Sequence, residues 1–339
     1  MSGPPPDASS SPAPAGEFGR IDRYFRPLTA GFAPALDLAD DAALVDVPAG
    51  QQLVVTTDAM VAGIHFLPTD PPADIAAKLV RVNLSDLAAK GARPYAYSLA
   101  VELPRDLPEA WLAAFTGGLR DEQERWDFRL LGGDSVATTG PVGLTLSALG
   151  LVPAGGMVRR SGARPGDHVY VTGTVGDGAF GLMIVLDRLR HPLSVEDRAF
   201  LVGRLRRPEP RLALIEVLRR HATAALDISD GLVSDLGHLA RASGVALEIR
   251  SADIPLSAAG RRLVERQPDL MSHALTGGDD YEIAFTAPAA SHEALVCQAR
   301  KAGVPVACIG HVEAGDPAVR VRDPAGTVQP FERSGWSHF

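Results

Sequence analysis

The sequence predicts a two-domain protein of the α/β or α+β class. The chain has 339 residues, a length that suggests two domains. Stretches with the spacing of strands and of helices alternate along both halves. A segment rich in Gly and Pro, at 152–167, separates the halves. We therefore place a first domain at 16–153 and a second at 154–339.

Residues 1–15 are dominated by Pro, Ser and Ala, and we expect them to form a disordered tail. They lack the basic and apolar regions of a secretory signal, and no stretch reaches the roughly 18 apolar residues of a membrane span. The two cysteines, Cys297 and Cys308, are expected to be buried free thiols, with a disulfide as the alternative. Together these features predict a cytoplasmic protein.

The first half begins with helical spacing of the apolar residues Phe18, Ile21 and Phe25. Strands are expected near 42–47 and 52–57, followed by a strong helix at 73–90 that Gly91 ends. A strand at 95–102, a helix at 109–125 and strands near 128–132 and 141–152 complete this half.

The second half begins with a strand at 167–173 and a Gly-rich turn into a helix at 178–189. Helices are expected at 195–205 and 209–220, and a strand-to-helix junction at 224–242. Strands near 245–250, 281–287 and 305–312 follow. The motif Gly132-Gly133-Asp134 recurs as Gly277-Gly278-Asp279. The recurrence indicates either that the two halves share a duplicated plan or that the match is chance.

Several aspartates stand where a folded chain gains little from them. Asp58 follows a strand and comes directly after Thr56 and Thr57, so three oxygen-bearing side chains are adjacent. Hard cations such as Mg²⁺ prefer ligands of this kind. The alternative is an ordinary turn residue at a strand end.

Asp86 lies inside an apolar helix, where Asp has poor propensity, and near the helix C-terminus, where its charge opposes the macrodipole. Asn83, three residues earlier, falls on the same face. This placement is compatible with a metal or phosphate site, and also with a solvated helix face.

Two further aspartate motifs follow predicted strands. Asp134 comes after Gly132-Gly133, a pair that permits close approach of a ligand or an ordinary hairpin turn. In Asp227-Ile228-Ser229-Asp230, Ser229 or Asp230 is placed to cap the following helix. Capping leaves the other oxygen-bearing residues unexplained, and they are suited to one ion at a helix N-terminus, an end that also favours phosphate.

Gathering these carboxylates in one place is unfavourable unless a cation joins them. Two carboxylates about 4 Å apart repel by roughly 4 kcal/mol at an effective dielectric near 20. In such a site, either the pKa values of some of the carboxyl groups rise or cations bind to them. Since no Cys/His cluster has the spacing of a zinc site, the sequence predicts Mg²⁺.

Other nucleotide motifs are absent or incomplete. The sequence contains no GxxxxGK[ST] and no protein-kinase motif set. The stretch from Gly173 to Gly178 imitates a dinucleotide fingerprint but lacks the full pattern, and helix–strand packing explains it better. A net charge of −8 argues against a nucleic-acid binder that relies on a basic face.

The ordered motifs resemble those of thiamine-monophosphate kinases, from about residue 16 to the C-terminus. They are ADDAAL, TTDAMVAGIHF, VNLSDLAAKGARP, LLGGDS, RRSGARPGD, VTGTVGDGAFGL, LDISDGLVSDLGHLA and GGDDYE. The resemblance implies an aminoimidazole ribonucleotide synthetase-like fold with two domains, the first of which forms a β-barrel with that of a second copy in a homodimer. It also implies direct transfer of the γ-phosphate of ATP to thiamine monophosphate, the last step of thiamine diphosphate biosynthesis.

The resemblance also implies roles for individual residues. Those expected to hold several Mg²⁺ ions are Asp41, Thr56, Thr57, Asp58, Asp86, Asp134, Asp227 and Asp230. Those expected to contact ATP are Gly133, Asp134, Arg160 (or Arg159 beside it) and Ser229. Those expected to contact thiamine monophosphate are His65, Asp279 and Trp336. No general base is expected beyond these groups, because the acceptor phosphate is largely ionised at pH 7.

The chain departs from the family pattern at three positions. Ala39 stands where a glycine is usual, Ile64 precedes His65 where relatives often carry Asn, and Asp279 replaces a common Glu with a side chain one methylene shorter. No expected metal ligand is lost.

Other functions remain as alternatives. A selenophosphate synthetase calls for a reactive cysteine near the N-terminus, yet none precedes Cys297. A carbamoyl-modifying relative would end in a catalytic cysteine, and this chain ends in Phe339. An aminoimidazole ribonucleotide synthetase would lack GGDDYE with an aromatic residue near the end. A non-catalytic protein that senses thiamine phosphates would bind without turnover.

Overall fold

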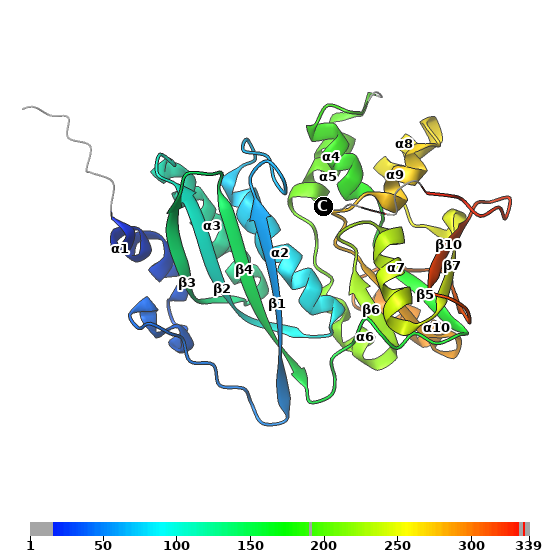
Figure 1. The fold of residues 1–339 in the computed structure, drawn as a ribbon, viewed down its shortest axis with the longest axis horizontal. Coiled ribbons are helices and arrows are strands. Elements are labelled where there is room, and N and C mark those ends of the chain that lie inside the picture. Colours follow the sequence, from blue (N-terminus) through cyan, green and yellow to red (C-terminus); the bar gives the residue numbers. More distant parts are fainter. Residues whose placement is uncertain (1–15, 190–191, 332–334, 336–339) are drawn as a thin grey trace, which may run out of the picture.

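The structure is a computed structural model that describes residues 16–189, 192–331 and 335. Two bodies lie side by side, each built on one β-sheet (Figure 1). Helix α2 lies between the sheet of the first body and the second body. Among the described helices, none combines the length and the apolar character that a membrane span requires.

The first body holds a four-stranded sheet in the order β1-β4-β2-β3, in which only β2 and β3 are parallel. Its strands are β1 Gln51–Val61, β2 Arg93–Pro104, β3 Arg129–Thr138 and β4 Gly143–Pro153. Helices α2 Pro72–Ala89 and α3 Glu109–Trp126 cover one face (Figure 1). Strands β1 and β3 are the edges, so the sheet is not closed into a barrel within one chain.

The N-terminal turn confirms one prediction and overturns another. Helix α1 Glu17–Arg20 continues into a π-helical turn at Ile21–Phe25 and 3₁₀ turns at Arg26–Thr29 and Ala33–Leu38. Phe25 packs into the core, as the helical spacing predicts, whereas Phe18, which belongs to the same predicted spacing, is 79% exposed. The predicted strand at 42–47 is wrong: Leu44 is 64% exposed, and none of the strands in the described part of the chain pairs with this segment.

Helix α2 is buried on nearly all sides because it packs against both bodies. It contacts β1 and β4 of the first sheet and also β6 and α5 of the second body. Of its 18 residues, 14 are buried, and the polar ones among them need partners. Arg81 pairs with Glu122 of α3 and donates to the carbonyl oxygens of Arg207 and Pro208. The helix ends before Gly91, which has a φ of 68°.

The second body holds a six-stranded sheet in the order β10-β7-β9-β5-β8-β6, antiparallel except for the pair β7 and β10. Its strands are β5 Asp167–Thr172, β6 Ala224–Asp227, β7 Ala246–Arg250, β8 Ile283–Pro288, β9 Val306–Glu313 and β10 Ala318–Arg322. Both sheets therefore contain parallel and antiparallel strand pairs. Of the two predicted classes, α/β and α+β, this arrangement favours α+β.

The helices of the second body are α4 Asp177–Val185, α5 Val195–Arg206, α6 Ile215–His221, α7 Leu232–Ser243, α8 Ala258–Arg266, α9 Leu270–Thr276 and α10 His292–Lys301. The last three, and strand β10, were not among the predicted elements. Both cysteines are free, as expected, but Cys297 is exposed because it lies on the outer side of α10, away from Leu295 and Ala299.

Candidate active site

Strand β1 presents Thr56 and Asp58 on the face that α2 covers. Side chains two residues apart on a strand share a face, and Val54 and Met60, on that same face, are buried. The Thr56 hydroxyl donates a hydrogen bond to Oδ2 of Asp86 on α2 at 2.5 Å. Thr56 and Asp86, two of the predicted ligands, are thus joined directly.

Three carboxylates from three elements lie in one another's electric field. Burial, and then the charge of Asp86, raises the pKa of Asp58 to about 7. At the end of β6, burial raises the pKa of Asp227 well above its usual value, and Asp86, Asp235 and Asp58 raise it further. The structure therefore places Asp58, Asp86 and Asp227 close enough to affect one another's charge, at the junction of the two bodies.

This cluster suits a hard divalent cation. Its donors are carboxylate and hydroxyl oxygens, the ligands that Mg²⁺ takes in proteins. Without a cation, burial and mutual repulsion favour protonation of Asp58 and Asp227. A bound cation would reverse that preference, because its charge stabilises the ionised carboxylates. The donor chemistry of these residues therefore fits Mg²⁺.

The turn after β6 is built by a residue that the sequence did not single out. Oδ2 of Asp235 accepts hydrogen bonds from the backbone N–H groups of Ser229, Asp230 and Gly231 at 3.0, 3.0 and 3.1 Å. The side chains of Ser229 and Asp230 therefore do not cap α7, as the capping alternative required. Asp235 satisfies these donors from the first turn of α7, which leaves Ser229 and Asp230 for another role.

The segment 277–282 alternates buried anchors with residues at the domain junction. Asp280 accepts hydrogen bonds from the N–H groups of Gly176 and Gly178 at 2.7 and 3.0 Å. Glu282 accepts from the Thr172 hydroxyl at 2.6 Å and is paired with two arginines. Both anchors are almost fully buried. They also attach the Gly-rich turn at 173–178 to this segment, so its glycines serve packing, as predicted.

The residues that precede each anchor, Asp279 and Tyr281, have φ values of 68° and 50°. Such left-handed conformations are strained for residues other than glycine and persist where the surroundings impose them. Lys78 Nζ of α2 lies 2.8 Å from Oδ1 of Asp279. Burial, and then Asp279, Asp58 and Asp227, raises the pKa of the Tyr281 phenol. Both residues thus belong to the surroundings of the carboxylate cluster.

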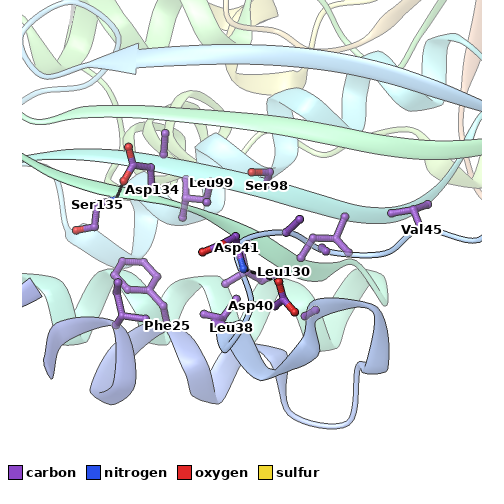
Figure 2. A pocket seen from close by; sticks show the side chains of 18 residues that line it. Phe25, Leu38, Asp40, Asp41, Val45, Ser98, Leu99, Leu130, Asp134 and Ser135 are labelled. Carbon is purple, nitrogen blue, oxygen red and sulfur yellow. Dashed lines mark hydrogen bonds between the residues drawn. The ribbon is translucent and has the colours of Figure 1, made fainter. Parts of the chain in front are cut away.

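A second group of predicted residues lies at the other edge of the first sheet. Asp41, Gly133 and Asp134 line a cavity of about 630 Å³, with Asp40 and Ser98 beside them and Phe25 and Leu38 as an apolar wall (Figure 2). The residues Gly132 to Asp134 lie inside β3, which rules out the hairpin turn that was the alternative for this motif. The duplicated plan gains no support, because 277–279 is a loop.

The two groups are too far apart in one chain to share an ion. The strand register places Asp58 in one row with Leu146, Leu99 and Gly133. Three strand spacings, about 14 Å, therefore separate Asp58 from Gly133, whereas Mg²⁺ holds its ligands at about 2.1 Å.

The remaining predicted residues are placed as follows. Thr57 lies on the opposite face from Thr56, where its hydroxyl is 2.9 Å from that of Ser147. Arg160 is exposed, and its charge helps to lower the pKa values of Lys90 and His238, so it lies near the turn at 227–231. His65 lies in the β1–α2 loop. Trp336 is outside the described residues.

Sequence reasoning missed Lys78, Lys90, Asp235 and Tyr281. A signal existed for the lysines: they lie eight residues before and four after Asp86, which places all three on one side of a helix. Lys90 Nζ donates to the carbonyl oxygen of Ala225 at 2.7 Å, so it too contacts the second body. No spacing rule would have identified the contacts of Asp235 or Tyr281, which depend on tertiary structure.

The chain matches two family models, AIR synthase related protein, N-terminal domain, over residues 39–152, and the corresponding C-terminal domain over 164–322. Thiamine-monophosphate kinase of Escherichia coli K12 is 44% identical over 96% of this chain and 98% of its own length. That of Caulobacter vibrioides is 41% identical over 98% of this chain and 93% of its own.

Solved structures agree with these relatives. Thiamine-monophosphate kinase from Stenotrophomonas maltophilia is 41% identical, has a TM-score of 0.81, and aligns over 90% of this chain and 96% of that one. AaThiL complexed with AMPPCP and TMP is 32% identical, with a TM-score of 0.75 and coverages of 96% and 97%. Hydrogenase maturation protein HypE, at 18% identity and a TM-score of 0.74, shares the fold alone. The chain therefore belongs to the thiamine-monophosphate kinase family, within the two-domain AIR synthase related fold.

Proposed function

We propose that this protein transfers the γ-phosphate of ATP directly to thiamine monophosphate, giving thiamine diphosphate and ADP in the cytoplasm, as the last step of thiamine diphosphate biosynthesis. The observation that carries the proposal is the meeting of Asp58, Asp86 and Asp227 at the domain junction of a member of this kinase family. A relative complexed with an ATP analogue and TMP supports the choice of substrates.

Mg²⁺ would be held by the predicted carboxylates, first those of Asp58, Asp86 and Asp227, with the Thr56 hydroxyl and Asp230 beside them. When bound, it would neutralise charge on the phosphates and on the transferring group. The chain's own part is to keep these oxygens in place. Asp235 does so for the turn at 227–231 through three backbone N–H groups.

The predicted ATP contacts are divided between the two bodies. Arg160 and Ser229 lie near the turn after β6 and would bind phosphate oxygens, Arg160 with its planar fork. Gly133 and Asp134 line the cavity at β3, whose apolar wall suits a base. His65, Asp279 and Trp336 would bind the thiamine phosphate. Because the acceptor is already ionised, no residue needs to remove a proton.

We also propose that the active form is a homodimer with a shared β-barrel. Strand β1 is an open edge of 11 residues, and open edges of this length pair with other chains unless they are covered. Val55 on β1 and Val136 on β3 are 61% and 45% exposed. A dimer would also give Gly133 and Asp134 a way to join the carboxylate cluster of the other copy.

Complementation tests this arrangement. Asp58→Asn and Asp134→Asn are expected to be inactive alone, and mixed dimers formed by refolding them together should regain activity, because one of their two sites then has every residue. Light scattering should give twice the mass of the chain. A monomeric active enzyme would refute the dimer, and a dimer without complementation would refute the sharing of sites.

A coupled assay of ADP release across several phosphate monoesters tests the function itself. Thiamine monophosphate with MgATP should give ADP and thiamine diphosphate in equal amounts. Turnover with another acceptor alone would overturn the substrate and keep the phosphotransfer chemistry. Binding of both ligands without ADP release would favour the sensor alternative.

A further inference from the structure

We propose that Lys78 is a positioning residue for the phosphorylated acceptor. It binds both the β1–α2 loop and the segment 277–282, and so fixes the distance between these two segments. The inference rests on the proposed function, because it takes these two segments as the walls of the acceptor site. It concerns a residue of α2 that lies outside the expected substrate and metal contacts.

Lys78 is a buried cation with partners on both sides of the domain junction. It is only 5% exposed. Its Nζ lies 2.8 Å from Oδ1 of Asp279 in the second body and donates to the carbonyl oxygen of His65 in the first at 3.1 Å. A buried ammonium group is stable only when paired and hydrogen-bonded, so these contacts strongly restrict the geometry of the three residues.

The His65 partner is held at two points. Its ring Nδ1 accepts a hydrogen bond from the backbone N–H of Val61 at 3.0 Å. Its carbonyl oxygen is held by Lys78. The ring is thus oriented by β1, and the loop backbone that carries it is attached to α2.

The Asp279 partner is also held at two points, in different bodies. Its backbone N–H donates to the carbonyl oxygen of Ser229 at 2.9 Å, and its carboxylate is paired with Lys78. Its φ of 68° is a conformation that needs support from its surroundings. Loss of Lys78 would release the carboxylate and leave a partly buried charge without its cation.

Other ion pairs cross the same junction without touching these residues, and a more exposed one provides a control for a change at the junction itself. Arg207 Nε lies 2.5 Å from Oδ1 of Asp74, and the Arg207 side chain is 49% exposed. Exposed pairs of this kind contribute little to stability. Loss of a contact that merely joins the bodies should change the KM values of both substrates alike or leave both unchanged, whereas loss of a positioning residue should change recognition of one substrate.

The experiment compares Lys78→Met, Lys78→Arg and Arg207→Gln in the full chain by steady-state kinetics with each substrate varied. Lys78→Met should raise the KM for thiamine monophosphate by about tenfold or more, the effect of breaking a buried charge contact, and leave the KM for ATP within about twofold. Lys78→Arg, which keeps the charge, should recover part of the loss. Arg207→Gln should leave both KM values unchanged.

The double variant Lys78→Met/Asp279→Asn guards against a folding defect, because it removes both charges. If Lys78 acts through Asp279, the double variant should bind the acceptor no worse than Asp279→Asn alone. Equal changes in both KM values, or additive losses in the double variant, would overturn the proposal. If the wild type turns over a different acceptor, the proposed function fails. The KM for that acceptor, compared with the KM for ATP in the same variants, still tests the role of Lys78.

Discussion

Replacing Asp58 by Asn is expected to abolish phosphoryl transfer while leaving the fold intact. The variant keeps the size of the side chain but removes one of three carboxylates that meet at the domain junction. We expect kcat to fall by more than about 100-fold, because disturbing even the groups around a metal ligand costs 10–100-fold. The assay is thiamine diphosphate formation, with Asp316→Asn, at an exposed position, as the control.

The same substitution should stabilise the metal-free protein, and the pH dependence follows from the pKa. Burial raises the pKa of Asp58 to about 7 in the folded state, against about 3.9 in the unfolded chain. The unfolded state therefore ionises first as pH rises from about 4 to 7, and the wild type loses stability over that range. At about pH 8 without Mg²⁺, Asp58→Asn should melt above the wild type, and the difference should shrink toward pH 4.

Added Mg²⁺ supplies a measurement that does not depend on activity. It should raise the melting temperature of the wild type at about pH 8, since a ligand of the folded state stabilises it, and should raise that of Asp58→Asn much less. Equal activity in Asp58→Asn and the wild type, or equal stabilisation of both by Mg²⁺, would mean that the cluster is not the metal site.

Gly278→Ala is expected to have a comparably large effect through packing. A Cβ atom at this position would lie 2.1 Å from the carbonyl oxygen of Ser229. Since the obstacle is backbone, the turn at 227–231 and the segment 277–282 must separate, which breaks the hydrogen bond from Asp279 to Ser229. We expect a loss of about 1–3 kcal/mol in stability and of about 100-fold in kcat/KM, the effect of a displacement near 1 Å in an active site.

Gly117→Ala is the matched control for this substitution. Gly117 lies in the interior of α3, and a Cβ atom there would have no neighbour within 4 Å. Alanine should stabilise the helix by about 0.5–1 kcal/mol and leave activity unchanged. Thermal melts and kinetics of the two variants separate a local clash from a general effect of losing a glycine. Wild-type kinetics in Gly278→Ala would show that the two segments need not stay in contact.

The elements that could be predicted were those with strong local signals. The helix predicted at 73–90 is α2 Pro72–Ala89, because its apolar spacing and the stop at Gly91 are properties of the local sequence. The segment 42–47 has an apolar composition like that of a strand, but a strand also needs a neighbour to pair with, and composition does not report one. Helices α8, α9 and α10, of nine, seven and ten residues, were missed although helices as short as α4 and α6 were predicted.

The candidate site was predictable in its residue types and not in its grouping. The awkward placing of Asp86 inside an apolar helix pointed to a special role, and the structure places it beside Thr56. The division of the predicted ligands into a cluster around Asp58 and a cavity around Asp134 depends on strand order. Strand order is a property of the whole sheet, which residue spacing along the chain does not contain.

The most direct test of phosphoryl transfer at the Asp58 cluster is a single-turnover reaction with ATP labelled in its γ-phosphate, from which samples are quenched at successive times. With thiamine monophosphate and Mg²⁺, the label should pass to thiamine diphosphate at the rate of ADP formation, with none bound to the protein, and Asp58→Asn should show no transfer. Label on the protein, label released only as inorganic phosphate, or undiminished transfer in Asp58→Asn would contradict it.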